Sequence, residues 1–226
     1  MPIEPDIIGE YFVIDYLLDH RRKLDSIIKV LWKQFGSFTY FLLRCVETYA
    51  NNERFIKLVC SHNILECVFP TFTAGMYVNL SYYQNITYLP KTIQKFEEWF
   101  RNYPHNEDIA IAYARGLVNL TNKQELKECQ STIEKLELLS NTYSHNEEIA
   151  KRYAKGLLNL SLKQEELQSI ETIERLEEVI IRYSDNENVL EVYGMSLNMY
   201  AKRFNLDYEE FLNSRIEKIN KALSED

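Results

Sequence analysis

The side chains of this chain that could bind a metal are few and do not form a recognisable ligand set. Cys60, His62 and Cys67 lie close together in the sequence. Zinc sites usually need paired ligands at fixed short spacing, with a second pair elsewhere. Free cysteines that are buried otherwise behave as small hydrophobic residues. We therefore expect no bound metal.

Acid–base and phosphate-binding patterns give no reason to expect an enzyme. The carboxylates of Glu177–Glu178 and Glu209–Glu210 are adjacent, so on a helix they point to different sides and do not form a catalytic dyad. Neither G-x-G-x-x-G nor G-x-x-x-x-G-K-[ST] occurs in the sequence,. We expect neither a catalytic residue nor a cofactor.

The composition predicts an all-α fold. Only 6 glycines and 5 prolines occur among 226 residues, whereas all-β sandwiches and barrels need a turn about every 8–12 residues. The net charge of −8 counts against nucleic-acid binding, because nucleic-acid binders usually carry a basic footprint.

The sequence also gives no reason to expect contact with a membrane. Residues 67–90 are uncharged but include Pro70, Asn79 and Gln84, and backbone breaks and polar groups are poorly tolerated in lipid. The first residues lack a basic stretch followed by an apolar run,. The four cysteines show no C-x-x-C spacing. We expect a cytoplasmic protein.

A sequence repeat of fixed period is the most informative feature of the chain. Residues 103–121, YPHNEDIAIAYARGLVNLT, and 143–161, YSHNEEIAKRYAKGLLNLS, share twelve of nineteen residues, and a weaker copy covers 183–201. The offset from Tyr103 to Tyr143, and again from Tyr143 to Tyr183, is the repeat period. Self-similarity at such a period is typical of repeat proteins.

Each repeat is predicted to form two helices. The first begins after Asn106, Asn146 or Asn186, each a good N-cap followed by acidic residues,. The second is expected over about 123–143 and 163–183, and apolar residues recur along it at three- and four-residue spacing,. Asp207 and Glu210 resemble a capping box that opens a last helix over 208–223, whose polar outer face would make it a cap,.

The segment from Tyr103 to Leu120 resembles the junction between tetratricopeptide repeats. Pro104 stands at the inter-repeat proline of that family, and Ala110, Tyr113, Ala114 and Leu117 stand at its large, small and aromatic positions. The family's period is shorter than the one in this chain, and its signature Trp is absent here. The resemblance covers about residues 71–223. It implies a right-handed α-solenoid of antiparallel helix pairs, with repeats over 71–226.

The resemblance also implies a peptide-binding groove lined by the first helices of the repeats. Carried over, the groove positions favour a partner-binding set of seven residues: Asp108, Arg115, Asn119, Glu148, Lys151, Lys155 and Asn159. Further groove positions in the third copy are Asn188, Glu191, Met195, Asn198 and Met199. The cations suit an acidic peptide or a C-terminal carboxylate. We expect a non-catalytic scaffold or adaptor that binds a protein or peptide.

Two alternative interpretations of these residues remain open. Glu147–Lys151 and Glu148–Arg152 have the spacing of ordinary surface ion pairs on a helix,. Asn79, Asn119 and Asn159 recur at one repeat position, where an asparagine inside a helix either binds a partner's backbone or bonds a neighbouring helix.

The N-terminal segment, residues 1–70, does not show the repeat. It is predicted to form helices at about 7–20, 22–35, 38–49 and 53–67, with interruptions near Gly36 and Asn51–Asn52. The string from Pro5 to Val13 resembles the end of the ATPase module of some bacterial signal-transducing NTPases. That resemblance implies an alternative function, as a sensor region or detached relative of such a protein. The other interpretation is a simple helical cap for the repeats.

Overall fold

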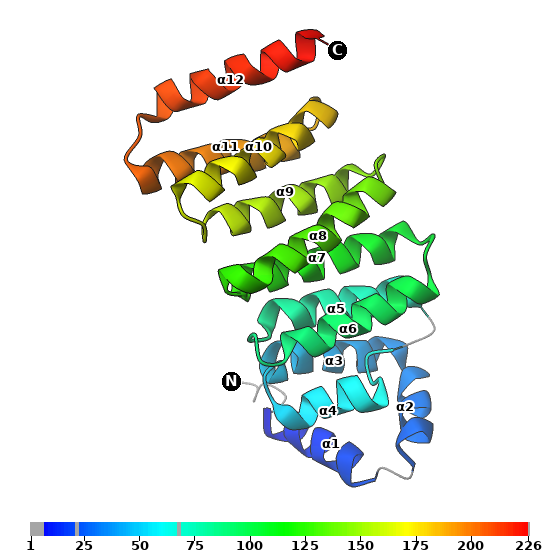
Figure 1. The fold of residues 1–226 in the computed structure, drawn as a ribbon. Helices are drawn as coiled ribbons and strands as arrows, with labels where there is room; N and C mark the ends of the chain where they lie inside the picture. Colours follow the sequence, from blue (N-terminus) through cyan, green and yellow to red (C-terminus); the bar gives the residue numbers. More distant parts are fainter. Residues whose placement is uncertain (1–6, 21–22, 67–68, 226) are drawn as a thin grey trace, which may run out of the picture. The chain divides into compact units, whose positions relative to one another are not determined.

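The computed structural model describes residues 7–20, 23–66 and 69–225. These residues form twelve helices and no strand (Figure 1). In chain order the helices are α1 (Ile7–Asp19), α2 (Leu24–Trp32), α3 (Phe35–Tyr49), α4 (Glu53–His62), α5 (Pro70–Tyr83), α6 (Leu89–Asn102), α7 (Glu107–Lys123), α8 (Leu126–Thr142), α9 (Glu147–Ser161), α10 (Glu166–Arg182), α11 (Glu187–Phe204) and α12 (Tyr208–Glu225). The prediction of an all-α fold is confirmed.

The chain divides into two compact units, residues 1–116 and 117–226, and the boundary falls inside α7. The first unit holds α1 to α6, with α1 against α4, α3 against α5, and α5 against α6. Its core includes the fully buried rings of Phe55, Tyr77 and Phe96. The prediction of a boundary between residues 70 and 71 concerns the start of the repeats and stays a prediction.

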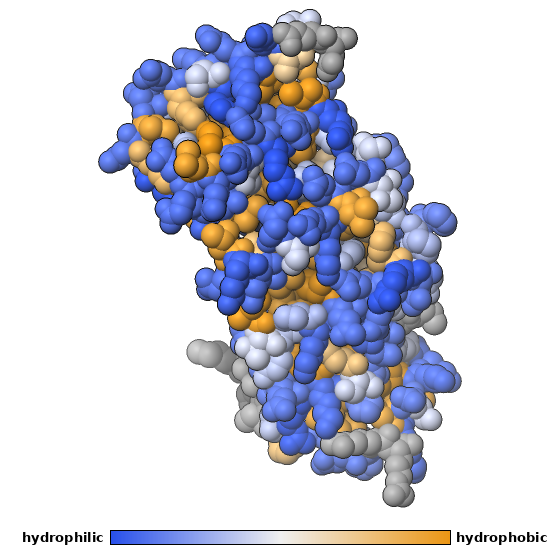
Figure 2. Space-filling view, in the orientation of Figure 1, coloured by the Kyte–Doolittle hydropathy of each residue, from blue (hydrophilic) through white to orange (hydrophobic). Residues whose placement is uncertain are grey.

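The second unit is built from contacts between helices that are near neighbours in the chain. α9 packs against α8, α10 and α11, while α12 packs against α10 and α11. This nearest-neighbour arrangement is compatible with a helical repeat, in which each repeat contacts only adjacent ones. Figure 2 shows that hydrophilic side chains cover most of the visible face.

The asparagines that recur at the repeat period begin the first helices, as predicted. Asn106 Oδ1 accepts from the Ile109 N–H at 3.1 Å, Asn146 Oδ1 accepts from the Ile149 N–H at 3.1 Å, and Asn186 Oδ1 accepts from the Val189 N–H at 3.0 Å. Each bond satisfies a backbone donor that the first helical turn leaves without a partner.

Basic side chains join the ends of consecutive first helices in the second unit. Lys163 Nζ donates to the Thr121 carbonyl at 2.7 Å, beside the end of α7. Arg203 Nη1 donates to the Leu162 carbonyl at 2.7 Å, just beyond the end of α9. Because the last carbonyls of a helix lack intrahelical partners, cations there are stabilising.

Some predicted helix boundaries differ from those observed. The second helices α8 and α10 begin three residues later than expected, because Lys123 still belongs to α7 and α9 runs to Ser161. Gly36 lies inside α3, so the break before this helix falls at Lys33–Gln34. The start of the segment from Pro5 to Val13, which resembles the end of the NTPase module, lies outside the described residues. Cys67 lies outside them as well.

The last helix begins as predicted and has a mainly polar outer side. Asp207 Oδ1 accepts from the Glu210 N–H at 2.9 Å, which is one half of the predicted capping box. Most exposed side chains of α12 are polar, and Ile216 and Leu223 are exceptions. None of the described helices is long and apolar enough to cross a membrane.

Candidate functional site

The partner-binding residues predicted from the sequence lie on two helices, α7 and α9. Asp108 and Arg115 are exposed on the part of α7 that belongs to the first unit. Asn119 is half-buried on the part that belongs to the second unit. The remaining residues share one side of α9, because positions 148, 151, 155 and 159 follow a helical spacing,.

Two predicted residues of α9 bind other side chains of the chain. Lys151 is half-buried, and its Nζ donates to Asn188 Oδ1 on α11 at 2.6 Å. Glu148 forms an ion pair with Arg152 one turn along the helix. The alternative interpretation as a surface pair therefore describes Glu148–Arg152. It does not describe Glu147, which accepts a hydrogen bond from Asn186 Nδ2 at 2.6 Å.

Lys155 differs from its neighbours because its ammonium group forms no hydrogen bond or ion pair with a described residue. The side chain is half-buried. Burial lowers the pKa of Lys155, and the nearby Arg152 and Lys151 cations lower it further, whereas Glu191 and Glu148 act in the opposite direction. A partly desolvated cation without a bonded anion is favourable for binding a carboxylate.

Asn159 has a structural partner within the second unit. Its Nδ2 donates to Thr121 Oγ1 at 3.0 Å and lies 3.4 Å from the Val118 carbonyl, both on α7. The side chain therefore links two consecutive first helices, which accounts for an asparagine at an unfavourable position inside a helix. This is the bonding of a neighbouring helix that the repeated asparagines predict.

Beside α9, helix α11 presents two exposed methionines. Met195 and Met199 are 47% and 39% exposed. They stand one repeat period after Lys155 and Asn159, and α9 packs against α11. Hydrogen bonds join α9 and α11 at both ends, from Asn186 to Glu147 and from Arg203 to Leu162. Both bonds keep the two helices in register at one repeat period. Flexible thioether side chains are common on surfaces that adapt to a partner. We name the exposed side of these two helices the α9/α11 face, defined by Lys151, Lys155, Asn159, Met195 and Met199.

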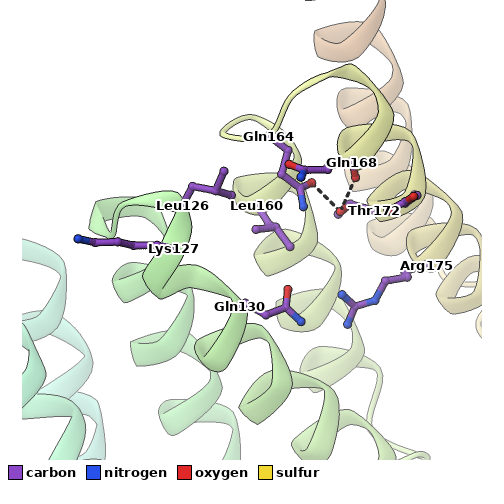
Figure 3. Close-up of a pocket in the computed structure, with 9 residues that line it drawn as sticks. Leu126, Lys127, Gln130, Leu160, Gln164, Gln168, Thr172 and Arg175 are labelled. Atoms are coloured by element: carbon purple, nitrogen blue, oxygen red, sulfur yellow. Dashed lines mark hydrogen bonds between the residues drawn. The ribbon is translucent and has the colours of Figure 1, made fainter.

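A separate pocket of about 440 Å³ lies between α8 and α10 (Figure 3). Polar side chains that line it include Gln130, Gln164, Gln168 and Arg175, and Leu160 of α9 adds an apolar side chain. The residues of the α9/α11 face do not line it. Part of its polar capacity is used internally, since Thr172 Oγ1 donates to Gln164 Oε1 at 2.6 Å, drawn dashed in Figure 3. The sequence interpretation did not single out these glutamines.

A tyrosine–glutamate–arginine network that recurs in the second unit is the main feature that the sequence interpretation missed. Tyr153 Oη donates to Glu137 Oε1 at 3.1 Å, and Arg175 Nη2 reaches both groups at 3.1 and 3.3 Å. The same network recurs one repeat period later in Tyr193, Glu177 and Arg215. Burial raises the pKa of Tyr153 to about 12, with Arg175 opposing and Glu137 adding to the shift. The signal was present in the sequence, because each member of the first network has the same residue type at the matching position of the next repeat.

Burial and hydrogen bonding shift the pKa values of several side chains of the chain. Tyr113, Tyr153 and Tyr193 have raised pKa values, and each donates a hydrogen bond to a glutamate carboxylate. Burial also raises the pKa of the Cys45 thiol, which disfavours the reactive thiolate,. Among the described residues, no group of three or more His, Cys, Asp or Glu side chains is placed to hold a metal ion.

Comparisons of the chain with protein-family models, with curated proteins and with solved structures find no match.

Proposed function

We propose that the chain is a non-catalytic protein-interaction module of tetratricopeptide type, in which the repeats form a right-handed solenoid of antiparallel helix pairs. In this proposal the module works in the cytoplasm, where its cysteines stay reduced. The α9/α11 face binds a peptide segment of a partner protein, and the module serves as a scaffold or adaptor.

The observation that supports this proposal is the setting of Lys155. Its half-buried ammonium group has no bonded anion, and it stands on the same face as the exposed side chains of Met195 and Met199. A cation beside exposed thioethers can bind a carboxylate and an apolar side chain of one ligand at the same time. The partner is therefore an acidic segment that also carries an aliphatic or aromatic residue.

Neighbouring contacts keep this face ready for binding. Lys151 is held against α11 by Asn188, and Asn159 is held against α7 by Thr121. Because these bonds exist before a ligand arrives, binding does not have to order the helices, which lowers its entropic cost. In the proposal Lys155 is the residue that contacts the ligand carboxylate directly.

Peptide display against the immobilised full chain tests the proposal. A random peptide library is selected on the protein, and the affinities of individual peptides are measured by fluorescence anisotropy. We expect selected peptides to combine Asp or Glu with a large apolar residue. The double variant Lys151→Glu/Lys155→Glu should weaken their binding at least tenfold, and binding should also weaken as salt is added.

The matched control is Lys29→Glu/Lys57→Glu, which makes the same change of charge at two exposed positions in the first unit. This control should bind like the unmodified chain. The proposal fails if both double variants lose affinity equally, or if neither does while the circular dichroism melts stay unchanged.

A further inference from the structure

Each pair of second and first helices in the repeat region meets through the same contact. On the second helix, an apolar residue is followed directly by a glutamate. On the first helix, a tyrosine is followed three residues later by a small residue. In the first unit, Tyr113 Oη donates to Glu97 Oε1 at 3.0 Å, and Gly116 lies so close to Phe96 that a Cβ would be 2.7 Å from its Cε2. We call the apolar residue and the glutamate together a socket.

The second unit contains two more filled sockets. On α8, Glu137 accepts from Tyr153, and a Cβ on Gly156 would lie 2.5 Å from Leu136 Cδ1. On α10, Glu177 accepts from Tyr193 at 3.0 Å.

In the α10 socket, Ser196 of α11 stands where the other occupants have glycine. Its hydroxyl donates to the Val192 carbonyl at 2.8 Å. The occupant of a socket is thus always a helix with Tyr-x-x-Gly or Tyr-x-x-Ser.

Helix α12 carries a fourth socket that no described residue covers. Ile216 and Glu217 stand one repeat period after Leu176 and Glu177. Ile216 is 41% exposed, whereas Phe96, Leu136 and Leu176 are at most 1% exposed. Glu217 is exposed and makes no hydrogen bond or ion pair with a described residue. Leu223, 42% exposed, lies two turns further along the same side,.

One polar replacement adapts the α12 socket to reversible use. Asn213 stands where Ile133 and Ile173 lie in the earlier second helices. In α8 that isoleucine contacts the small residue of the occupant, since a Cβ on Gly156 would be 3.0 Å from Ile133 Cδ1. An amide at this point tolerates water when the socket is empty and can bond a serine hydroxyl when it is filled.

We propose that α12 binds an amphipathic helix of a partner protein that carries the sequence Tyr-x-x-Ser on its apolar side. The tyrosine hydroxyl donates to Glu217, the serine lies between Asn213 and Ile216, and a further apolar residue covers Leu223. This site is on a different helix from the α9/α11 face and does not depend on the function proposed for that face.

Burial of the chain's own Tyr-x-x-small helices argues against a second copy as the occupant. Tyr113, Tyr153 and Tyr193 are each 5% exposed and already bonded in the filled sockets. A second copy could offer such a helix only by opening one of its own helix pairs, which would expose a buried tyrosine and break its hydrogen bond. A partner with a free helix incurs no such loss.

A peptide with the sequence of residues 186–205 serves as the probe, because it contains the Tyr-x-x-Ser occupant of a filled socket. The fluorescein-labelled peptide is titrated with the full chain and followed by anisotropy. We expect saturable binding that Ile216→Asp weakens at least tenfold. Glu217→Gln should also weaken it, and Glu210→Gln, which removes the same charge from the same helix, should not.

A double-mutant cycle distinguishes the proposed contact from general stickiness. Replacing the peptide tyrosine that corresponds to Tyr193 with Phe should remove the effect of Glu217→Gln, because the first change deletes the hydrogen bond that the second one weakens by removing the charge of its acceptor. Additive effects, equal losses in Glu217→Gln and Glu210→Gln, or binding unaffected by Ile216→Asp would each overturn the proposal. So would sedimentation showing a dimer of the chain that Ile216→Asp dissociates, because the occupant would then be a second copy.

Discussion

Arg215 of α12 binds Glu177 of α10 through two hydrogen bonds, from Nε at 2.5 Å and from Nη2 at 2.8 Å. Both side chains are largely buried, and Tyr193 donates to the same carboxylate. The ion pair therefore joins α12 to α10 through two charged groups that have little access to water.

Removing the arginine should destabilise the second unit strongly. Arg215→Met leaves the Glu177 carboxylate buried with too few cations, so the free energy of unfolding should fall by about 3–5 kcal/mol. Urea denaturation followed by circular dichroism measures this. Lys202→Met, at an exposed position of α11, is the control and should change the value little. A loss of similar size in both variants would contradict the account of the pair.

Two glycines should respond to alanine with opposite signs. A Cβ on Gly156 would lie 2.5 Å from Leu136 Cδ1 and 3.0 Å from Ile133 Cδ1, whereas a Cβ on Gly194 would meet nothing within 4 Å. Overpacking typically costs about 1–3 kcal/mol, and replacing a helical glycine with alanine gains about 1 kcal/mol. Gly156→Ala should therefore lower the melting temperature and Gly194→Ala should raise it. Equal shifts would show that the α8–α9 contact is looser than observed.

The N-cap of α11 should not tolerate aspartate, although aspartate is normally as good an N-cap as asparagine. Asn186 Nδ2 donates to Glu147 Oε2 at 2.6 Å, so Asn186→Asp would place two carboxylates in contact,. We expect the variant to be destabilised at pH 7 in thermal melts. Adding Glu147→Gln should restore most of the stability. If the second change gave no recovery, the bond between the two helix starts would not matter.

Alkaline unfolding should depend on Tyr153. Its pKa is raised to about 12 in the folded chain, chiefly by burial, from an ordinary value of 10.0. A group with a raised folded-state pKa contributes stability that is fully present below the unfolded-state value and is lost as the pH rises between the two. Stability should therefore fall between pH 10 and 12, and Tyr153→Phe should make that fall shallower. Tyr40→Phe, at an exposed position, should leave the profile unchanged.

Local chemistry explains why part of this fold could be predicted from the sequence. The asparagines at 106, 146 and 186 act within three residues of themselves, so their role as N-caps followed from residue type and position,. The fixed repeat period likewise allowed two helices to be predicted in each repeat. The start of α8 was predicted too early. Because Lys123 is charged, the pattern of apolar residues does not show whether it ends α7 or begins α8.

Contacts between helices explain why the rest could not be predicted. The bond from Tyr193 to Glu177 spans 16 residues, and the bond from Arg215 to Glu177 spans 38. Glutamate and arginine on helices usually lie in water, so residue type alone does not predict that these side chains bond across helices. The sequence likewise grouped Arg115, Lys151 and Lys155 as cations of one predicted partner-binding set. It could not show that Lys151 is bound by Asn188 whereas Lys155 is not.

The cations that bind the carbonyl groups at the ends of α7 and α9 have a consequence for how such a chain can change in length. Lys163 and Arg203 stand one repeat period apart, and each reaches the carbonyl groups at the end of the preceding first helix. A tandem duplication of one whole repeat would therefore supply a new donor together with a new set of acceptors and leave the older bonds intact. An insertion of two or three residues within a helix would rotate the cation away from its carbonyls. Growth by complete repeats is the change of length that this pattern of bonds permits.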